Sequence, residues 1–282
     1  MDWLLLLTVI VGMSAQSIAK KEYNKRLSGG RFIFSAAATV IAGLFFLFLG
    51  IDDFSYQSEM LIYSILFAVS FATATVCSFF AIANGPLSLT SLVTQYSLII
   101  PTFYGLLFLD EKVGKWLVVG LILLFFSILF INFTKGGQKI TLKWAIFAFL
   151  AFVGNGMCST VQKVQQTAFD GAGKNEFMSV ALFMAAVGML VFVFISERKD
   201  AAVSIKKGAL WMVLCGVANA VVNLFVMILS NSMPASIMFP LISAGGIIMS
   251  AAVSIFVYKE KLTPVQMIGL ALGTASVIFL NL

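Results

Sequence analysis

The fold of this chain is decided by Leu107-Phe108-Leu109-Asp110-Glu111-Lys112 and by its second copy, Phe256-Val257-Tyr258-Lys259-Glu260-Lys261. Each copy ends one apolar stretch of membrane-spanning length and leads into another. Three pairs recur at a constant offset of 149 residues: Glu111 and Glu260, Gly120 and Gly269, and Asn132 and Asn281. Internal repetition indicates architecture before any local feature does. The repeat predicts a duplicated membrane unit, an organisation typical of transporters.

The composition agrees with a membrane protein and disfavours an enzyme. Hydrophobic residues make up 61% of the 282 residues and charged residues 11%, whereas a soluble domain carries about 25% charged residues. The chain contains no histidine, which excludes Ser-His-Asp triads, HExxH zinc sites and ordinary haem ligation. Cys77, Cys158 and Cys215 each lie inside an apolar segment, at spacings typical of neither metal sites nor disulfides. We therefore expect no enzyme activity, no cofactor and no metal.

Ten apolar segments are long enough to cross a bilayer, and each should be a helix because lipid cannot satisfy irregular backbone. They are Trp3–Ala19, Phe32–Ile51, Met60–Ala83, Leu87–Leu109, Trp116–Phe133, Leu142–Ala168, Phe177–Ile195, Ala209–Leu229, Ala235–Val257 and Pro264–Leu280. This predicts an all-α polytopic membrane protein with ten transmembrane helices.

A polar linker rich in Gly and Lys, residues 135–141, separates two predicted five-helix repeats, residues 1–134 and 142–282. Because five is odd, a tandem copy must enter the membrane in the opposite direction, which makes an inverted repeat. The helices that open the two halves support this, because several of their residues recur at one offset of 142. The pairs are Gly12 and Gly154, Ser17 and Ser159, and Lys21 and Lys163.

The net charge of +6 comes from short basic clusters between apolar segments, a pattern that orients membrane proteins rather than binding nucleic acid. Most of the 18 Lys and Arg residues lie in loops that follow the odd-numbered segments. The other loops hold Lys112, Lys115 and Lys174. The positive-inside rule then predicts a multi-pass protein of the cell membrane with both termini outside.

Two stretches resemble EamA-type transporters of the drug/metabolite transporter superfamily. Pro101 to Glu111 resembles the end of the fourth helix in that family, and Glu260 to Gly269 resembles the matching signature of the second half. The chain departs from the family pattern where Asp110 and Lys259 replace a usual Gly, and where Ser250 replaces a usual Pro. The resemblance implies a secondary transporter of small metabolites that works by alternating access. It also implies cytoplasmic termini, opposite to the charge count.

Polar side chains deep in apolar helices are costly, so we treat them as candidate substrate ligands. Asn219 and Asn223 lie four residues apart, on one helix face. Gln16 and Asn155 lie in the helices that, in the family, line a central cavity. Gln95-Tyr96 precedes the break expected at Pro101 and offers an amide and a phenol. For all of these, hydrogen bonding between helices is the alternative interpretation.

Charged candidates are fewer. Lys163 lies within an apolar segment among Gln162, Gln165 and Gln166. It is either a counter-ion for an anionic substrate group or a side chain that snorkels to the interface. Glu111 and Glu260 each lie at a helix boundary beside a Lys. Local pairing with that Lys is our interpretation, and coupling-ion binding is the alternative.

Together these patterns predict a transporter of a small polar or zwitterionic, amino-acid-like metabolite, in contact with the lipid bilayer. An efflux transporter for hydrophobic amines and a non-transporting membrane scaffold are the alternatives. Gly269 and Gly273 form a GxxxG stripe that predicts close helix packing, within the chain or in a homodimer. The predicted substrate-binding residues are Gln16, Gln95, Tyr96, Asn155, Lys163, Asn219 and Asn223.

Overall fold

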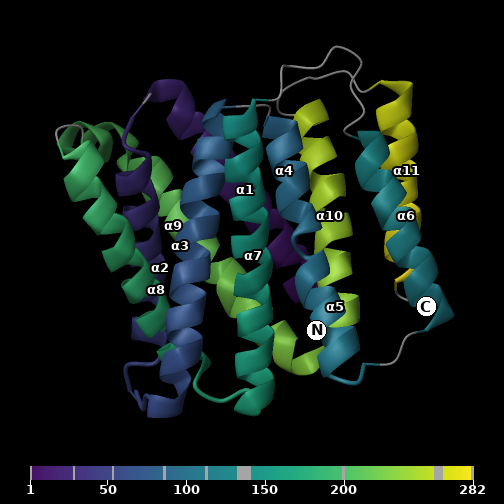
Figure 1. The fold of residues 1–282 in the computed structure, drawn as a ribbon, viewed down its shortest axis with the longest axis horizontal. Coiled ribbons are helices and arrows are strands. Elements are labelled where there is room, and N and C mark those ends of the chain that lie inside the picture. The colour runs from purple at the N-terminus through teal and green to yellow at the C-terminus, as the bar shows by residue number, and fades with distance from the viewer. Residues whose placement is uncertain are drawn as a thin grey trace.

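The structure is a computed structural model that describes residues 2–27, 29–52, 54–84, 87–111, 114–131, 141–198, 201–256 and 263–280. Within these ranges the regular elements are all helical, which confirms the all-α prediction (Figure 1). They are α1 (Asp2–Arg26), α2 (Arg31–Leu49), η1 (Ser58–Met60), α3 (Leu61–Asn84), α4 (Leu87–Tyr96), α5 (Ile99–Phe108), α6 (Lys115–Ile131), α7 (Leu142–Ala168), α8 (Lys174–Phe192), η2 (Val193–Glu197), α9 (Ala201–Ser232), α10 (Ala235–Phe256) and α11 (Pro264–Phe279).

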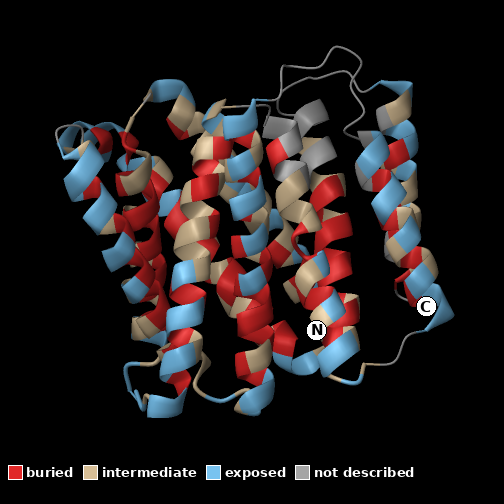
Figure 2. Cartoon of the chain, in the orientation of Figure 1, coloured by how far each residue is buried: buried red, intermediate tan, exposed pale blue. Residues whose placement is uncertain are grey.

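The helices agree with a multi-pass membrane protein. Six helical stretches are long and apolar enough to cross a bilayer: Asp2–Arg26, Arg31–Leu49, Ser58–Asn84, Leu142–Ala168, Lys174–Glu197 and Ala201–Ser232. Their outward faces carry exposed large hydrophobic residues such as Leu7, Phe149 and Val187. The exposed positions lie on the outside of the bundle in Figure 2, and the buried ones face its interior. A surface of this kind is suited to lipid rather than to water.

The prediction of one helix over Leu87–Leu109 is wrong, because the chain breaks between α4 and α5. The break follows from Pro101, which has no N–H and whose ring clashes with the carbonyl four residues earlier in a regular helix. That carbonyl belongs to Ser97, where α4 has ended. It accepts instead from the N–H of Ile100 at 3.1 Å, a tighter turn than an α-helix makes.

The helices of the two predicted repeats pack in matching pairs. In the predicted repeats α1 is equivalent to α7, and α3 to α9. α1 packs against α9, and in the same way α7 packs against α3. The equivalent helices α2 and α8 pack against each other. α6 and α11 form a pair at one edge of the bundle (Figure 1). In that pair the Ser127 hydroxyl donates to Gly269 O at 2.7 Å and the Ser276 hydroxyl donates to Gly120 O at 2.9 Å. These reciprocal bonds join positions related by the offset of 149 residues.

The direction of α1 relative to α7 follows from their contacts with α9. The last turns of α1 meet the beginning of α9, where Gly208 lies against Tyr23. The last turns of α7 meet the end of α9, where Lys163 contacts Ser230. α1 and α7 therefore run in opposite directions.

Three features named in the sequence analysis lie outside the described residues. They are residues 135–140 of the predicted linker, Asn132 and Glu260.

Candidate functional site: a central cavity

A cavity of about 250 Å³ lies between α1, α2, α3, α4, α7, α9 and α10. Its lining reaches Lys20, Ile82 and Val253 at one end, which we call the basic end. It stops near Gln162 and Val226 at the other. Beyond that point lie Lys163 and Glu111, which define what we call the sealed end. The cavity has roughly the dimensions of a small-molecule site and its lining mixes apolar and polar side chains.

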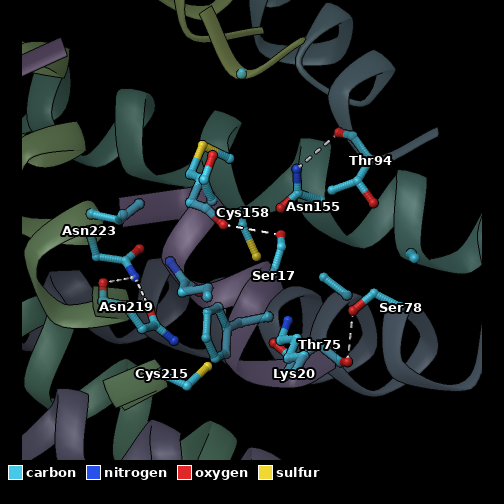
Figure 3. A pocket seen from close by; sticks show the side chains of 18 of the residues that line it. Ser17, Lys20, Thr75, Ser78, Thr94, Asn155, Cys158, Cys215, Asn219 and Asn223 are labelled. Carbon is cyan, nitrogen blue, oxygen red and sulfur yellow. Dashed lines mark hydrogen bonds between the residues drawn. The ribbon is translucent and has the colours of Figure 1, made fainter. Parts of the chain in front are cut away.

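Three amides form one wall of the cavity. Asn223 Nδ2 donates to Asn219 O at 2.9 Å and also to Asn219 Oδ1, because positions four apart share a helix face. Gln162 Nε2 donates to Asn223 Oδ1 at 2.8 Å and links α7 to α9. All three side chains are buried, and Figure 3 shows Asn219 and Asn223 together on one side of the pocket. The wall is a preformed polar surface in an apolar bundle.

Asn155 lies on the opposite side of the pocket, beside Thr94 (Figure 3). Its Nδ2 donates to Ser97 Oγ at 2.6 Å and to Thr94 O at 3.5 Å. α7 passes very close to the break here, because a Cβ on Gly156 would lie 2.7 Å from Ser97 O. Asn155 therefore holds the interrupted segment between α4 and α5 as well as lining the cavity.

Gln16 and Gln95 both line the cavity, from α1 and α4. The Oε1 atom of Gln95 is buried and accepts no hydrogen bond within the described part of the chain. A buried acceptor left unsatisfied is costly, and it indicates a place where a ligand or water binds. Tyr96 is directed elsewhere: its hydroxyl donates to Phe125 O at 3.4 Å, and its ring lines a smaller apolar pocket beside α5, α6 and α10.

Lys163 lies outside the cavity lining, at the sealed end. Its ammonium donates to Ser230 O at 2.9 Å and to Met233 O at 2.8 Å, the carbonyls at the end of α9. The Glu111 carboxylate is 4.0 Å away, and the two side chains are 9% and 10% exposed. Lys163 therefore neither faces the cavity nor snorkels to the interface, but holds the end of α9 from within.

Glu111 binds the start of α10, the helix that follows α9 in the chain. Its two carboxylate oxygens accept from the N–H groups of Ala235 and Ser236, each at 2.7 Å. Those groups begin α10, and a helix N-terminus favours an anion through its free donors and its dipole. Glu111 and Lys163 thus clamp the connection between α9 and α10, one from each predicted repeat. This clamp lies beyond the point where the cavity lining stops.

The structure brings together Gln16, Gln95, Asn155, Asn219 and Asn223 and leaves Tyr96 and Lys163 outside the lining. It also places Lys20 in the lining, which sequence reasoning missed. A signal existed, since the offset of 142 that pairs Lys21 with Lys163 also pairs Lys20 with Gln162. Both members of that second pair line the cavity.

Comparisons with known proteins agree with the helical fold. A family model described as the EamA-like transporter family matches residues 141–282, beginning one residue before the predicted second repeat. A solved structure described only as "Crystal structure of protein" is 12% identical, with a TM-score of 0.77, over 99% of this chain and 95% of that chain. At this identity the likeness concerns the fold alone. No curated protein matches the chain.

Proposed function

Because the chain belongs to the EamA-like transporter family, we propose that it is a secondary transporter of a small polar or zwitterionic, amino-acid-like metabolite. The observation that carries this proposal is the amide-walled cavity, closed at one end by Lys163 and Glu111 and reaching Lys20 at the other. A transporter of this class exposes one central site to each side of the membrane in turn.

Alternating access needs two units that rock about the site, and we assign these to residues 1–134 and 142–282. The opposite directions of α1 and α7 support an inverted repeat. The matching packing of α1 on α9 and of α7 on α3 supports it as well. The reciprocal serine bonds between α6 and α11 are what a two-fold axis between the repeats would produce.

The conversion between states breaks the clamp at the sealed end. In the present state Lys163 and Glu111 hold the connection between α9 and α10, and solute enters from the basic end. The positive-inside rule places the basic end in the cytoplasm, so this state is inward-facing. Opening the other side requires Lys163 to leave Ser230 O and Met233 O, and new partners must replace these bonds.

The lining favours a polar, uncharged or zwitterionic solute over a hydrophobic amine. Within the described part of the chain, the polar side chains among the otherwise apolar lining are amides, hydroxyls, two cysteine thiols and two lysines, and none is an Asp or Glu. A cationic amine would enter this site without a counter-ion, which is unfavourable in a medium of low dielectric constant. Amide groups both donate and accept, so they can bind an ammonium as well as a carboxylate.

The test is the double variant Asn219→Ala/Asn223→Ala in proteoliposomes. We expect counterflow of amino acids to fall at least about tenfold while membrane insertion and folding persist, because each lost ligand weakens binding by about 1 kcal/mol. Asn231→Ala on the same helix is the matched control, since Asn231 is exposed and lies outside the lining. Wild-type protein without flux of any amino acid would remove the substrate assignment. A scaffold would show no flux in any variant.

The inverted arrangement has its own test. Single cysteines at Lys25, in the last turn of α1, and at Ala172, after α7, mark equivalent helix ends. An inverted repeat places them on opposite faces of the membrane, so an impermeant thiol reagent added to sealed, oriented vesicles labels one and not the other. Labelling of both from one side contradicts the arrangement.

A further inference from the structure

We propose that Lys20 is the substrate's counter-ion: its ammonium binds the carboxylate of the solute inside the central cavity. The inference deepens the proposed function and rests on it. Lys20 lines the cavity and is half-buried. Within the described ranges, no carboxylate lies within ion-pair distance of Lys20, and no hydrogen bond of its ammonium is found.

Other lysines near the cavity already have partners. Lys163 donates to two carbonyls beside Glu111. Lys25, one turn beyond Lys20 on the same helix, pairs with Glu22 at 2.6 Å. Lys21 also lines the cavity, but it has an interaction of its own. Lys20 differs from all three because it lines the cavity and has no anionic partner among the residues that the structure describes.

The position of Lys20 suits a site rather than an interface. Lys20 lines the pocket with Thr75 and Ser78 of α3 and Cys215 of α9, and Figure 3 shows it close to Thr75. A cation that lines a cavity in an apolar bundle attracts an anion more strongly than the same cation does in water. An entering carboxylate supplies that anion.

The ligand class follows from the whole lining. Lys20 attracts one negative charge, and the amide wall of Gln162, Asn219 and Asn223 lies in the same cavity to bind further polar groups. A compound with a carboxylate and a second polar group or ammonium meets both. An amine without a carboxylate meets only the amides and is repelled by Lys20. The site is therefore selective for carboxylates, with or without an ammonium.

The electrostatic part of the proposal is tested without any substrate. Ser17→Cys, in a background where Cys77, Cys158 and Cys215 are Ala, places one thiol in the lining beside Lys20. We expect an anionic methanethiosulfonate to react faster, relative to a cationic one, when Lys20 is present. Lys20→Gln should lower that ratio about fivefold at low salt. Lys206→Gln, an exposed lysine on α9, should leave it unchanged. An unchanged ratio in Lys20→Gln overturns the proposal.

The ligand class is tested by protection of the same cysteine from a neutral maleimide. The probes are phenylalanine, 3-phenylpropionate and 2-phenylethylamine, which differ in carboxylate and ammonium. We expect the first two to protect the cysteine, and Lys20→Gln to abolish at least about nine-tenths of that protection. Protection that persists in Lys20→Gln overturns the role of Lys20 and leaves the proposed function intact. Protection by the amine alone, or by none of the three, overturns the proposed substrate class together with this inference.

Discussion

Two glutamates make the same local contact at opposite ends of the molecule. Glu197, at the end of η2, accepts from the N–H groups of Arg31, Phe32 and Ile33 at 2.8, 2.9 and 3.1 Å and so caps the start of α2. Glu111 caps the start of α10 in the same way at the sealed end. Glu197 lies near the basic end with no lysine within ion-pair distance in the described ranges, whereas Glu111 lies beside Lys163.

The difference teaches that a helix cap takes its role from its surroundings. The cap of Glu197 joins α2 to the end of α8 outside the cavity lining, so it stabilises the fold. The cap of Glu111 fixes the connection between α9 and α10, together with a buried cation from the other predicted repeat. The same carboxylate chemistry thus stabilises the start of α2 at one end and, beside a buried lysine, the connection between α9 and α10 at the other.

Of the substitutions that test this comparison, Lys163→Met should lower the stability of the protein the most. It leaves Ser230 O and Met233 O without their charged donor, and Glu111 without its neighbour. Removing one partner from a buried, charged contact costs about 3 kcal/mol. We expect a lower midpoint of thermal unfolding in detergent micelles. Lys206→Met, at an exposed position on α9, is the control and should not change the midpoint. Equal midpoints for both variants would mean that the clamp contributes nothing.

Glu111→Gln and Glu197→Gln test whether the two caps differ in consequence. Each should destabilise the protein by about 2 kcal/mol, since a helix cap contributes about that much. Only Glu111→Gln should also open the sealed end, measured as faster labelling of Ser17→Cys by an impermeant reagent added from that side. Faster labelling in both variants, or in neither, removes the distinction.

Gly30→Ala and Gly173→Ala compare the turns that begin α2 and α8. Both glycines have a left-handed backbone, with φ of +73° and +63°, so alanine is strained at each. A Cβ on Gly30 would meet the Ser204 hydroxyl and the buried Tyr23 hydroxyl, which donates to Gly30 O at 2.9 Å. A Cβ on Gly173 would meet the flexible end of Met60. We therefore expect Gly30→Ala to be the more destabilising by about 1 kcal/mol, measured by chemical unfolding. The reverse order would show that Met60 is the more rigid neighbour.

Lys25→Gln should have the smallest effect. Lys25 pairs with Glu22 on the exposed surface of the basic end, in contrast to the buried contact of Lys163. Exposed ion pairs contribute little because water and salt screen them. Thermal unfolding should show no change that exceeds the error of the measurement. A loss similar to that of Lys163→Met would mean that burial is not what separates the two lysines.

Much of the fold was predictable because membrane helices follow from local sequence. Apolar length alone located the helices, since only a helix satisfies its own backbone in lipid. The sequence indicated a break at Pro101 but did not divide Leu87–Leu109 into two helices, because some helices accommodate a proline. α10 does so at Pro240. Which of the two outcomes a proline produces depends on the packing around it, and single-chain patterns do not contain that information.

The site was predictable in part for the same reason. Asn219 and Asn223 were placed on one helix face by their spacing, and both line the cavity. Tyr96 is next to Gln95 in sequence, yet successive helix positions point about 100° apart, so one faces the cavity and the other faces α6. The positions of Lys163 and Lys20 were harder to predict, because a lysine's role depends on which anion or carbonyl its long side chain reaches.

The sequence by itself determined the helical membrane architecture, the family and the polar residues available to a site, because each depends on composition, spacing or repetition along the chain. Only the tertiary structure decided which polar groups face one another. It assigned Lys163 to the clamp with Glu111 and left Lys20 facing the cavity. The physical reason is that an ion's energy in an apolar bundle depends on partners brought close by folding, often from helices distant in the sequence.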